Sequence, residues 1–162
     1  MSKKTDLIKT ERLVFRGIVE SDANEIVSWR SKQEVYKYFK SPHMLTFEEH
    51  LNWYRNNYLT DENRYDWMCI EKNSGNKIGV FGLLKKDDVA EVNYLLIPEA
   101  QHKGYASEGL EALIQYAVDK WDVNSIIAEI HKENVESIAL IKKLGFGLRT
   151  NYGNFVTYGI ET

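Results

Sequence analysis

The sequence contains very little cysteine and proline. Of its 162 residues, one is cysteine and two are proline. A single cysteine cannot form an internal disulfide or a cysteine-rich metal site, so Cys69 is expected to be a small buried residue. Pro42 and Pro98 fall between periodic segments, and no linker, repeat or low-complexity segment interrupts the chain. We therefore expect one continuous domain over residues 1–162.

The chain also lacks an excess of positive charge and a long apolar run. Its formal net charge of -3 argues against a nucleic-acid partner, because such binding depends on clustered Lys and Arg side chains. No apolar run is long enough to cross a membrane, and the polar start Met1–Asp6 has no signal-peptide core. These features predict a cytoplasmic protein without a membrane or nucleic-acid partner.

Hydrophobic residues make up 43% of the chain and aromatic residues 12%, which is enough for one substantial core. Alternating or apolar runs predict strands at Leu13–Ile18, Trp67–Lys72, Lys77–Leu84, Glu91–Ile97, Ser125–Ile130, Gly147–Tyr152 and Phe155–Glu161. Caps and helical spacing predict helices after Ser21 and Asp22, around Val35–Phe39, after the capping box Thr46–Glu49, over Ala106–Lys120 and over Val135–Leu144. The pattern indicates an α+β (mixed α/β) fold with a mixed sheet of about seven strands flanked by about four or five helices.

The segment Gln101–Ala106 lies between an apolar strand and the amphipathic helix Ala106–Lys120. Such an order directs the unpaired amides of a helix N-terminus at open space, where they can bind a phosphorylated ligand. Gly104 would let the backbone approach that ligand closely, and Lys103 would add charge. A plain tight turn explains a single glycine about equally well.

A second motif follows the strand Ser125–Ile130. It consists of Asn134-Val135-Glu136-Ser137 and, at the end of the next helix, Leu144-Gly145-Phe146. Taken alone, the second part is also an ordinary helix stop. The loop pattern Gln-x-x-Gly-x-Ala followed by both parts in this order resembles the GNAT superfamily of N-acetyltransferases, from about Thr10 to the C-terminus.

This resemblance implies a GNAT fold whose sheet is splayed in the middle, with acetyl-CoA as cosubstrate and no metal. It implies that backbone groups near three strand residues pair with the pantetheine arm and that loop amides meet the pyrophosphate. The cofactor-binding residues implied are Leu95, Leu96, Ile97, Gln101, His102, Lys103, Gly104, Tyr105, Ala106, Ser107, Asn134 and Ser137. A β-bulge would free the strand groups for this purpose.

Acetylation of an amine needs a group that takes a proton from the ammonium and a donor that stabilises the oxyanion. By resemblance, Glu91 is the general base and the amide of Leu96 the oxyanion donor. Glu91 could equally be a solvated edge charge, and Glu129 is a second candidate. Many relatives carry a Tyr that protonates the departing thiolate, but Ile141 occupies that position here. Substitutes for this acid are Tyr94, Tyr105 and Ser137.

The segment between the first strand and the hairpin concentrates aromatic, basic and imidazole groups. Its pattern of Trp29-Arg30, His43 and Glu48-Glu49-His50-Leu51 is most similar to N-acetyltransferases acting on UDP-4-amino-4,6-dideoxy sugars in pseudaminic-acid type pathways. By that resemblance, the substrate-binding residues are Arg30, His50 and Lys85. Alternatively, the aromatic residues belong to the core, His50 is a surface residue and Lys85 belongs to a charged turn.

Other functions of the same fold stay open. The loop also resembles enzymes that acetylate protein N-termini or polyamines, and the acidic residues Glu48, Glu49, Asp61 and Glu62 would suit a polyamine. Ile141 at the expected Tyr position also leaves room for a non-catalytic acyl-CoA sensor. A homodimer could form if an edge strand such as Phe155–Glu161 paired between two copies.

Overall fold

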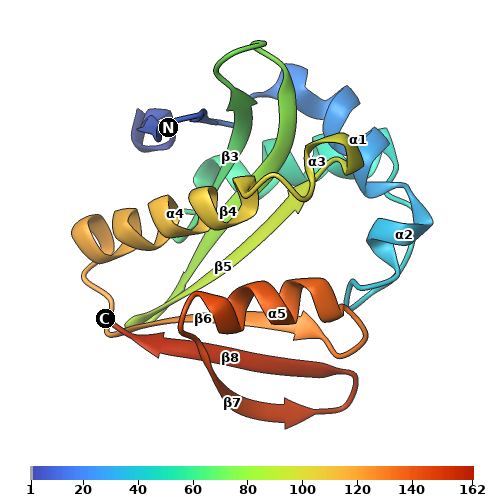
Figure 1. Ribbon diagram of the computed structural model, residues 1–162. Helices are drawn as coiled ribbons and strands as arrows, with labels where there is room; N and C mark the ends of the chain where they lie inside the picture. Colours follow the sequence, from blue (N-terminus) through green and yellow to red (C-terminus); the bar gives the residue numbers. More distant parts are fainter. Residues whose placement is uncertain (1) are drawn as a thin grey trace.

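A computed structural model describes residues 2–162 and contains one mixed sheet of eight strands in the order β1-β2-β3-β4-β5-β6-β8-β7 (Figure 1). The strands are β1 (Ile8–Lys9), β2 (Leu13–Gly17), β3 (Arg64–Glu71), β4 (Lys77–Lys86), β5 (Val89–Leu96), β6 (Ser125–His131), β7 (Gly147–Tyr152) and β8 (Phe155–Glu161). All neighbouring strands are antiparallel except β5 and β6, which are parallel. The α+β fold expected from the sequence is confirmed.

Helices cover both faces of the sheet (Figure 1). They are α1 (Ala23–Arg30), α2 (Gln33–Tyr36), α3 (Phe47–Asn56), α4 (Tyr105–Trp121) and α5 (Val135–Lys143). Short 3-10 turns lie at Ser2–Thr5, Glu20–Asp22, Tyr58–Thr60 and Pro98–Ala100. The apolar residues of α4 and α5 pack on one face, whereas α1 and α3 pack on the other.

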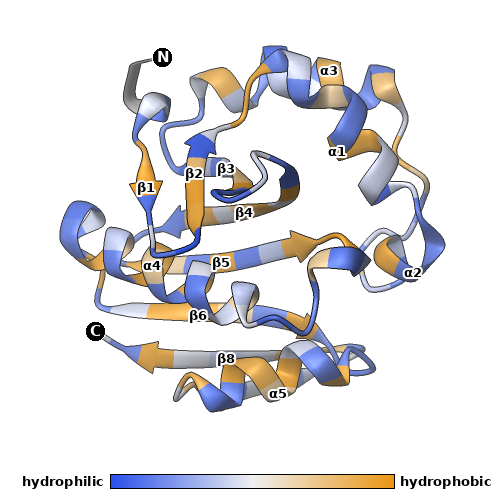
Figure 2. Ribbon diagram, turned by 45° about the horizontal axis from the view of Figure 1, so that its top comes forward, coloured by the Kyte–Doolittle hydropathy of each residue, from blue (hydrophilic) through white to orange (hydrophobic). Residues whose placement is uncertain are grey.

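Each face of the sheet has its own apolar cluster. Apolar residues recur along the central strands and the helices that cover them (Figure 2). On the α4 face, Leu110 and Leu113 pack with Phe81 of β4. On the α1 and α3 face, Ile26 packs with Val80, the residue next to Phe81. Because successive strand side chains point to opposite faces, β4 contributes to both clusters.

The sheet opens between β5 and β6. These two strands pair only at Val89–Glu91 with Ser125–Ile127, after which β6 continues in pairing with β8 alone. The β-bulge expected near the end of β5 is absent, because β4 and β5 pair without a register shift from Val89 to Leu96. The two strands diverge instead, and the divergence leaves the outer side of β5 without a strand partner.

Several local signals are confirmed. Thr46 and Glu49 form the expected capping box at the start of α3, and Gly145, with φ of 96°, follows the end of α5. Asp22 precedes α1 but its side chain does not cap that helix; it binds Arg16 and Lys77 instead. The expectation that Phe155–Glu161 is an edge strand is wrong, because this strand, β8, lies between β6 and β7.

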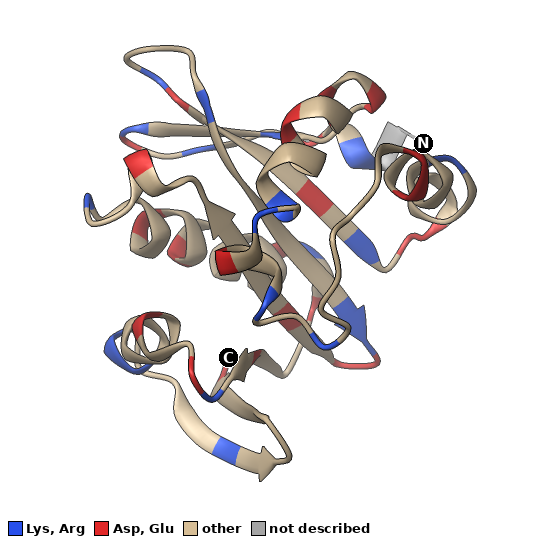
Figure 3. Ribbon diagram, turned by 90° about the vertical axis from the view of Figure 1, so that its right-hand side faces the viewer, with Lys and Arg blue, Asp and Glu red and all other residues tan. Residues whose placement is uncertain are grey.

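Within residues 2–162, no helix combines the length and apolar character that a membrane span requires. Acidic and basic residues are interspersed along the elements seen in Figure 3. The cytoplasmic location and the absence of a nucleic-acid partner stay predictions.

Candidate active site

The end of β5 directs one row of backbone groups into the opening beside β6. The amide of Ile97 donates to the Ile78 carbonyl at 2.9 Å, and the Leu95 carbonyl lies against Gly79, so both face β4. Since neighbouring residues of a strand point their backbone groups in opposite directions, Leu96 faces the opening. Its carbonyl accepts a hydrogen bond from Nε2 of Gln101 at 3.1 Å. Of the three strand residues named from the sequence, Leu96 alone offers its backbone to this gap.

The loop that follows β5 presents a row of amides at the start of α4. His102 and Gly104 are left-handed, with φ of 62° and 82°, and α4 begins at Tyr105. The first hydrogen bond of α4 runs from the amide of Glu108 to the Gly104 carbonyl at 3.1 Å, so the amides of residues 105 to 107 precede the helical hydrogen bonds. A Cβ on Gly104 would lie 3.2 Å from Nη2 of Arg12. The loop is therefore a tight turn, and the free amides at its end suit an anionic group.

Arg12, directly before β2, contacts this loop and the first turn of α4. It donates to the Lys103 carbonyl at 2.8 Å and to Glu108 at 2.7 Å, and its guanidinium stacks 4.4 Å from the ring centroid of Tyr105. The Tyr105 hydroxyl donates to Glu71 of β3, so its side chain is engaged beneath the loop. Sequence reasoning missed Arg12, because its contacts with residues 103 to 108 are about 90 positions away.

The N-terminus of α5 borders the other side of the opening. Asn134 caps α5 by accepting from the Ser137 amide at 3.4 Å, and the Ser137 hydroxyl lies 3.0 Å from the Tyr94 hydroxyl of β5. Tyr94 and Ser137, two of the three residues suggested as the acid for the departing thiolate, therefore meet across the gap. Burial raises the pKa of Tyr94, which keeps its hydroxyl protonated. Ile141 is 2% exposed and belongs to the core, where it carries no proton to donate.

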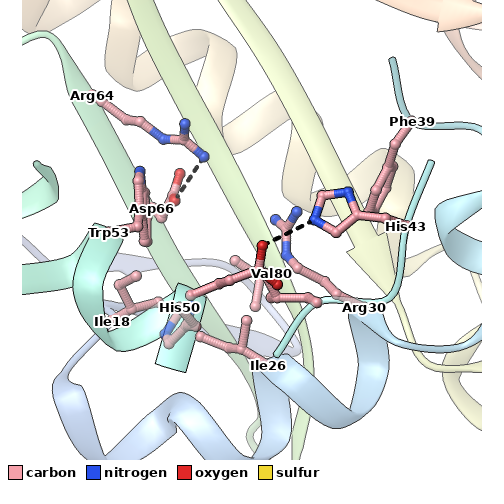
Figure 4. A pocket seen from close by; sticks show the side chains of 12 residues that line it. Ile18, Ile26, Arg30, Phe39, His43, His50, Trp53, Arg64, Asp66 and Val80 are labelled. Atoms are coloured by element: carbon pink, nitrogen blue, oxygen red, sulfur yellow. Dashed lines mark hydrogen bonds and ion pairs between the residues drawn. The ribbon is translucent and has the colours of Figure 1, made fainter. Parts of the chain in front are cut away.

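A cavity of about 230 Å³ lies on the face covered by α1 and α3 (Figure 4). Its lining residues are Ile18, Ile26, Arg30, Phe39, His43, Leu45, Glu49, His50, Trp53, Arg64, Asp66 and Val80. The structure thus brings together Arg30 and His50, two of the three residues assigned to the substrate from the sequence. The third, Lys85, does not line this cavity, because alternation along β4 places its side chain on the α4 face with Phe81.

The charged groups of this cavity are unevenly paired. Arg64 lies 3.3 Å from Asp66, and His43 lies 3.4 Å from Glu49. Within residues 2–162, the guanidinium of Arg30 has no hydrogen-bond or ion-pair partner; its neighbour is the Phe39 ring, 5.6 Å away. The cavity therefore contains one cation without a direct ion pair, and the carboxylate whose charge acts on it is that of Asp66.

His50 adds a second unsatisfied group. Its side chain is buried, at 3% exposure, and Nε2 has no hydrogen-bond partner in the structure. Burial, followed by the charge of Arg30, lowers the pKa of His50, so the ring is neutral at pH 7. A buried polar atom without a partner costs free energy, which a bound ligand would recover by hydrogen bonding.

Neither carboxylate named from the sequence as a base lines the cavity. Glu91 lies where β5 leaves β6 and pairs with Lys86 at 3.0 Å. Glu129, on β6, pairs with Lys40 at 2.5 Å. Strand alternation places Glu91 and Asn93 on the cavity's face of the sheet, opposite Ala90 and Val92 of the α4 core. Among residues 2–162, no cluster of three metal-binding side chains occurs.

The family comparison agrees with this geometry. The sequence family described as "Acetyltransferase (GNAT) domain" matches residues 12–147. The match covers most of the chain, including the loop, both sides of the opening and the cavity.

Relatives and solved structures are similar over nearly the whole chain. The Uncharacterized N-acetyltransferase YoaA of Bacillus subtilis (strain 168) is 29% identical over 145 residues, which cover 86% of this chain and 82% of YoaA. The spermidine N-acetyltransferase from Vibrio cholerae in complex with CoA and spermine has a TM-score of 0.84 at 20% identity, covering 94% and 96% of the two chains.

A third similar structure is RimL, a ribosomal L7/L12 alpha-N-protein acetyltransferase in complex with coenzyme A. Its TM-score is 0.81 at 18% identity, and the match covers 96% of this chain and 98% of RimL. At these identities the two solved structures establish the fold, and the family match establishes the reaction. The chain belongs to the GNAT acetyltransferase family and is an N-acetyltransferase that uses acetyl-CoA as its acetyl donor.

Proposed function

We propose that this enzyme acetylates the primary amine of a small acceptor that also carries an anionic group, namely a nucleotide-linked 4-amino-4,6-dideoxy sugar such as a UDP-amino sugar. The observation that carries the proposal is the guanidinium of Arg30, which forms no direct ion pair, in the same cavity as the unsatisfied Nε2 of His50. A phosphate or sugar oxygen would satisfy both groups, since guanidinium binds phosphate in a fixed fork and neutral imidazole forms one further hydrogen bond.

The rest of the cavity fits a deoxy sugar. Ile18, Ile26 and Val80 form an apolar part of its lining, which suits a methyl group in place of a hydroxymethyl group. The Trp53 ring offers a flat apolar wall for a sugar ring. A polyamine is less suited, because it carries no anionic group for Arg30, and each of the two carboxylates of the lining, Asp66 and Glu49, is shared with a basic side chain.

On the donor side, we propose that the amides of residues 102 to 107 and Lys103 hold the diphosphate, and that Leu96 offers its backbone to the pantetheine arm. Asn134 and Ser137 line the opposite side of the gap. Acetyl-CoA supplies the acetyl group as a thioester. This chain's own contribution is to orient that thioester and to stabilise the oxyanion, for which the Leu96 amide is the candidate donor.

We propose Glu91 as the proton acceptor, acting through water. Its carboxylate lies on the cavity's face of the sheet but outside the lining residues, and Lys86 holds it at 3.0 Å. A water between Glu91 and the amine would bridge that separation. For the departing thiolate, Tyr94 with Ser137 is the candidate acid, because their hydroxyls meet in the gap between β5 and α5.

The Gly104→Val variant tests the donor site. Valine at a left-handed position costs about 1–2 kcal/mol and would shift the loop against Arg12. We expect the dissociation constant for coenzyme A, measured by calorimetry, to rise about tenfold. Gly153→Val is the matched control, because Gly153 is also left-handed, with φ of 61°, but lies in the turn between β7 and β8. Equal coenzyme A affinity in both variants would contradict the assignment.

Acceptor class is tested by comparing three amines at equal concentration: a UDP-4-amino-4,6-dideoxy sugar, spermine and a peptide that begins with serine. The last two stand for the polyamine and protein N-terminal alternatives. Free thiol release from acetyl-CoA measures the rate. We expect the UDP-amino sugar to react at least tenfold faster than the other two. Faster acetylation of spermine or the peptide would replace the proposed acceptor, and background rates with all three would rule out all three acceptor classes.

A further inference from the structure

Asp66 is a buried carboxylate for which the sequence predicts no role. It lies on β3 and is 3% exposed, and it is the one buried carboxylate among the residues that line the cavity. The other lining carboxylate, Glu49, is exposed and belongs to the capping box of α3. Arg64 holds Asp66 at 3.3 Å (Figure 4), so the carboxylate has a fixed orientation and one oxygen available to a ligand.

Gly82 of β4 brings Asp66 next to Asn93 of β5. The three residues are register neighbours, since Asp66 pairs with Gly82 and Gly82 pairs with Asn93. A Cβ on Gly82 would lie 2.5 Å from Oδ1 of Asp66 and 2.9 Å from Oδ1 of Asn93. The two side chains therefore close over the glycine from both sides, and any larger residue at position 82 would separate them.

Asn93 extends this pair toward the opening. It lies in the part of β5 that has left β6, and its side chain is exposed. The row Asp66, Gly82 and Asn93 thus runs from the cavity to the gap in which the acetyl donor is proposed to bind. An acceptor held by Arg30 and His50 at one end of the cavity would place its amine along this row.

We propose that Asp66, together with Asn93 across Gly82, binds the amino group of the acceptor and points its nitrogen toward the gap between β5 and β6. This inference rests on the proposed function. The Asp66 carboxylate and the Asn93 carbonyl oxygen accept hydrogen bonds from the amine, which fixes the direction of its lone pair. Arg64 and Arg30 oppose the ammonium form, so Asp66 holds the amine without preventing its deprotonation.

The Asp66→Asn variant tests the proposal, because asparagine keeps the size of the side chain and its acceptor for Arg64 but removes the charge. With whichever of the three amines the wild type acetylates, we expect the KM for the amine to rise about tenfold and kcat/KM to fall about 30-fold. The KM for acetyl-CoA stays unchanged. Glu91→Gln, in contrast, lowers kcat and leaves the KM for the amine unchanged. Asp119→Asn, an exposed carboxylate of α4, is the matched control and keeps wild-type kinetics.

A second variant keeps the test decisive if Asp66→Asn does not fold. Asn93 is exposed, so Asn93→Ala should fold, and we expect it to raise the KM for the amine about fivefold with an unchanged melting temperature. Calorimetric binding of each amine to wild type and variants adds a readout without turnover. Wild-type KM and amine affinity in both variants would overturn this inference alone. Failure of all three amines to bind the wild type would overturn it together with the proposed acceptor.

Discussion

Replacing Arg30 with methionine is expected to lower kcat/KM for an anionic acceptor by about 100-fold, which corresponds to about 2.7 kcal/mol of transition-state stabilisation. Methionine keeps the length and apolar contacts of the side chain while removing the charge. The effect is large because, within residues 2–162, Arg30 is the one guanidinium of the cavity without a direct ion pair, whereas Arg64 is paired with Asp66. An anionic acceptor would therefore lose its main charged partner. The measurement is steady-state kinetics with the UDP-amino sugar as the varied substrate.

The control variant is Arg55→Met on α3. Arg55 is 56% exposed, and its partner is Glu20. Its loss should leave kcat/KM within about twofold of wild type, because exposed pairs contribute little. The dissociation constant for coenzyme A should be unchanged in both variants, since the loop at residues 102 to 107 leads into α4, which packs on the opposite face of the sheet from the cavity. If Arg30→Met acetylates the UDP-amino sugar at the wild-type rate, the acceptor's anionic group does not bind at Arg30.

Local signals in the sequence predicted the elements of the fold well. The capping box at Thr46, the helical spacing over Ala106–Lys120 and the glycine at position 145 each act within a few residues, and the structure has all three. Strand β1, only two residues long, was missed because two residues show no periodicity. The divergence of β5 and β6 could not be predicted from either strand alone, since it depends on where their pairing stops.

The site was predictable where a motif is continuous along the chain and not where strands bring residues together. Arg30 and His50 line one cavity, and their role in binding the acceptor stays a prediction. Alternation along β4 could have placed Lys85 away from this cavity, because Phe81, Leu83 and Lys85 point to the same face. Asp66, in contrast, had no local signal. Its position beside Asn93 depends on the registers of two strand pairs around Gly82.

Replacing Asp22 with alanine is expected to destabilise the fold by about 3 kcal/mol. Asp22 is fully buried and accepts hydrogen bonds from Arg16 at 2.8 and 2.9 Å, from the Val19 amide at 2.9 Å and from Lys77 at 2.9 Å. It thereby ties the end of β2 to the starts of α1 and β4. Alanine would leave two partly buried cations without a counterion. Urea unfolding of wild type and variant measures the difference in the free energy of unfolding, provided that this free energy falls with urea concentration at the same slope in both proteins.

The same carboxylate should make stability depend on pH. Burial by itself raises the pKa of Asp22, but the hydrogen bonds from Arg16, Val19 and Lys77 outweigh burial and lower the pKa to about 2. Since the unfolded value is about 3.9, Asp22 contributes about 2–3 kcal/mol above pH 4, and this contribution is lost as the pH falls from about 4 to about 2. The Asp22→Ala variant should lack that part of the acid dependence, whereas Glu20→Ala, at an exposed pair with Arg55, should keep it. An identical loss of stability between pH 4 and pH 2 in wild type and Asp22→Ala would assign the acid sensitivity to other carboxylates.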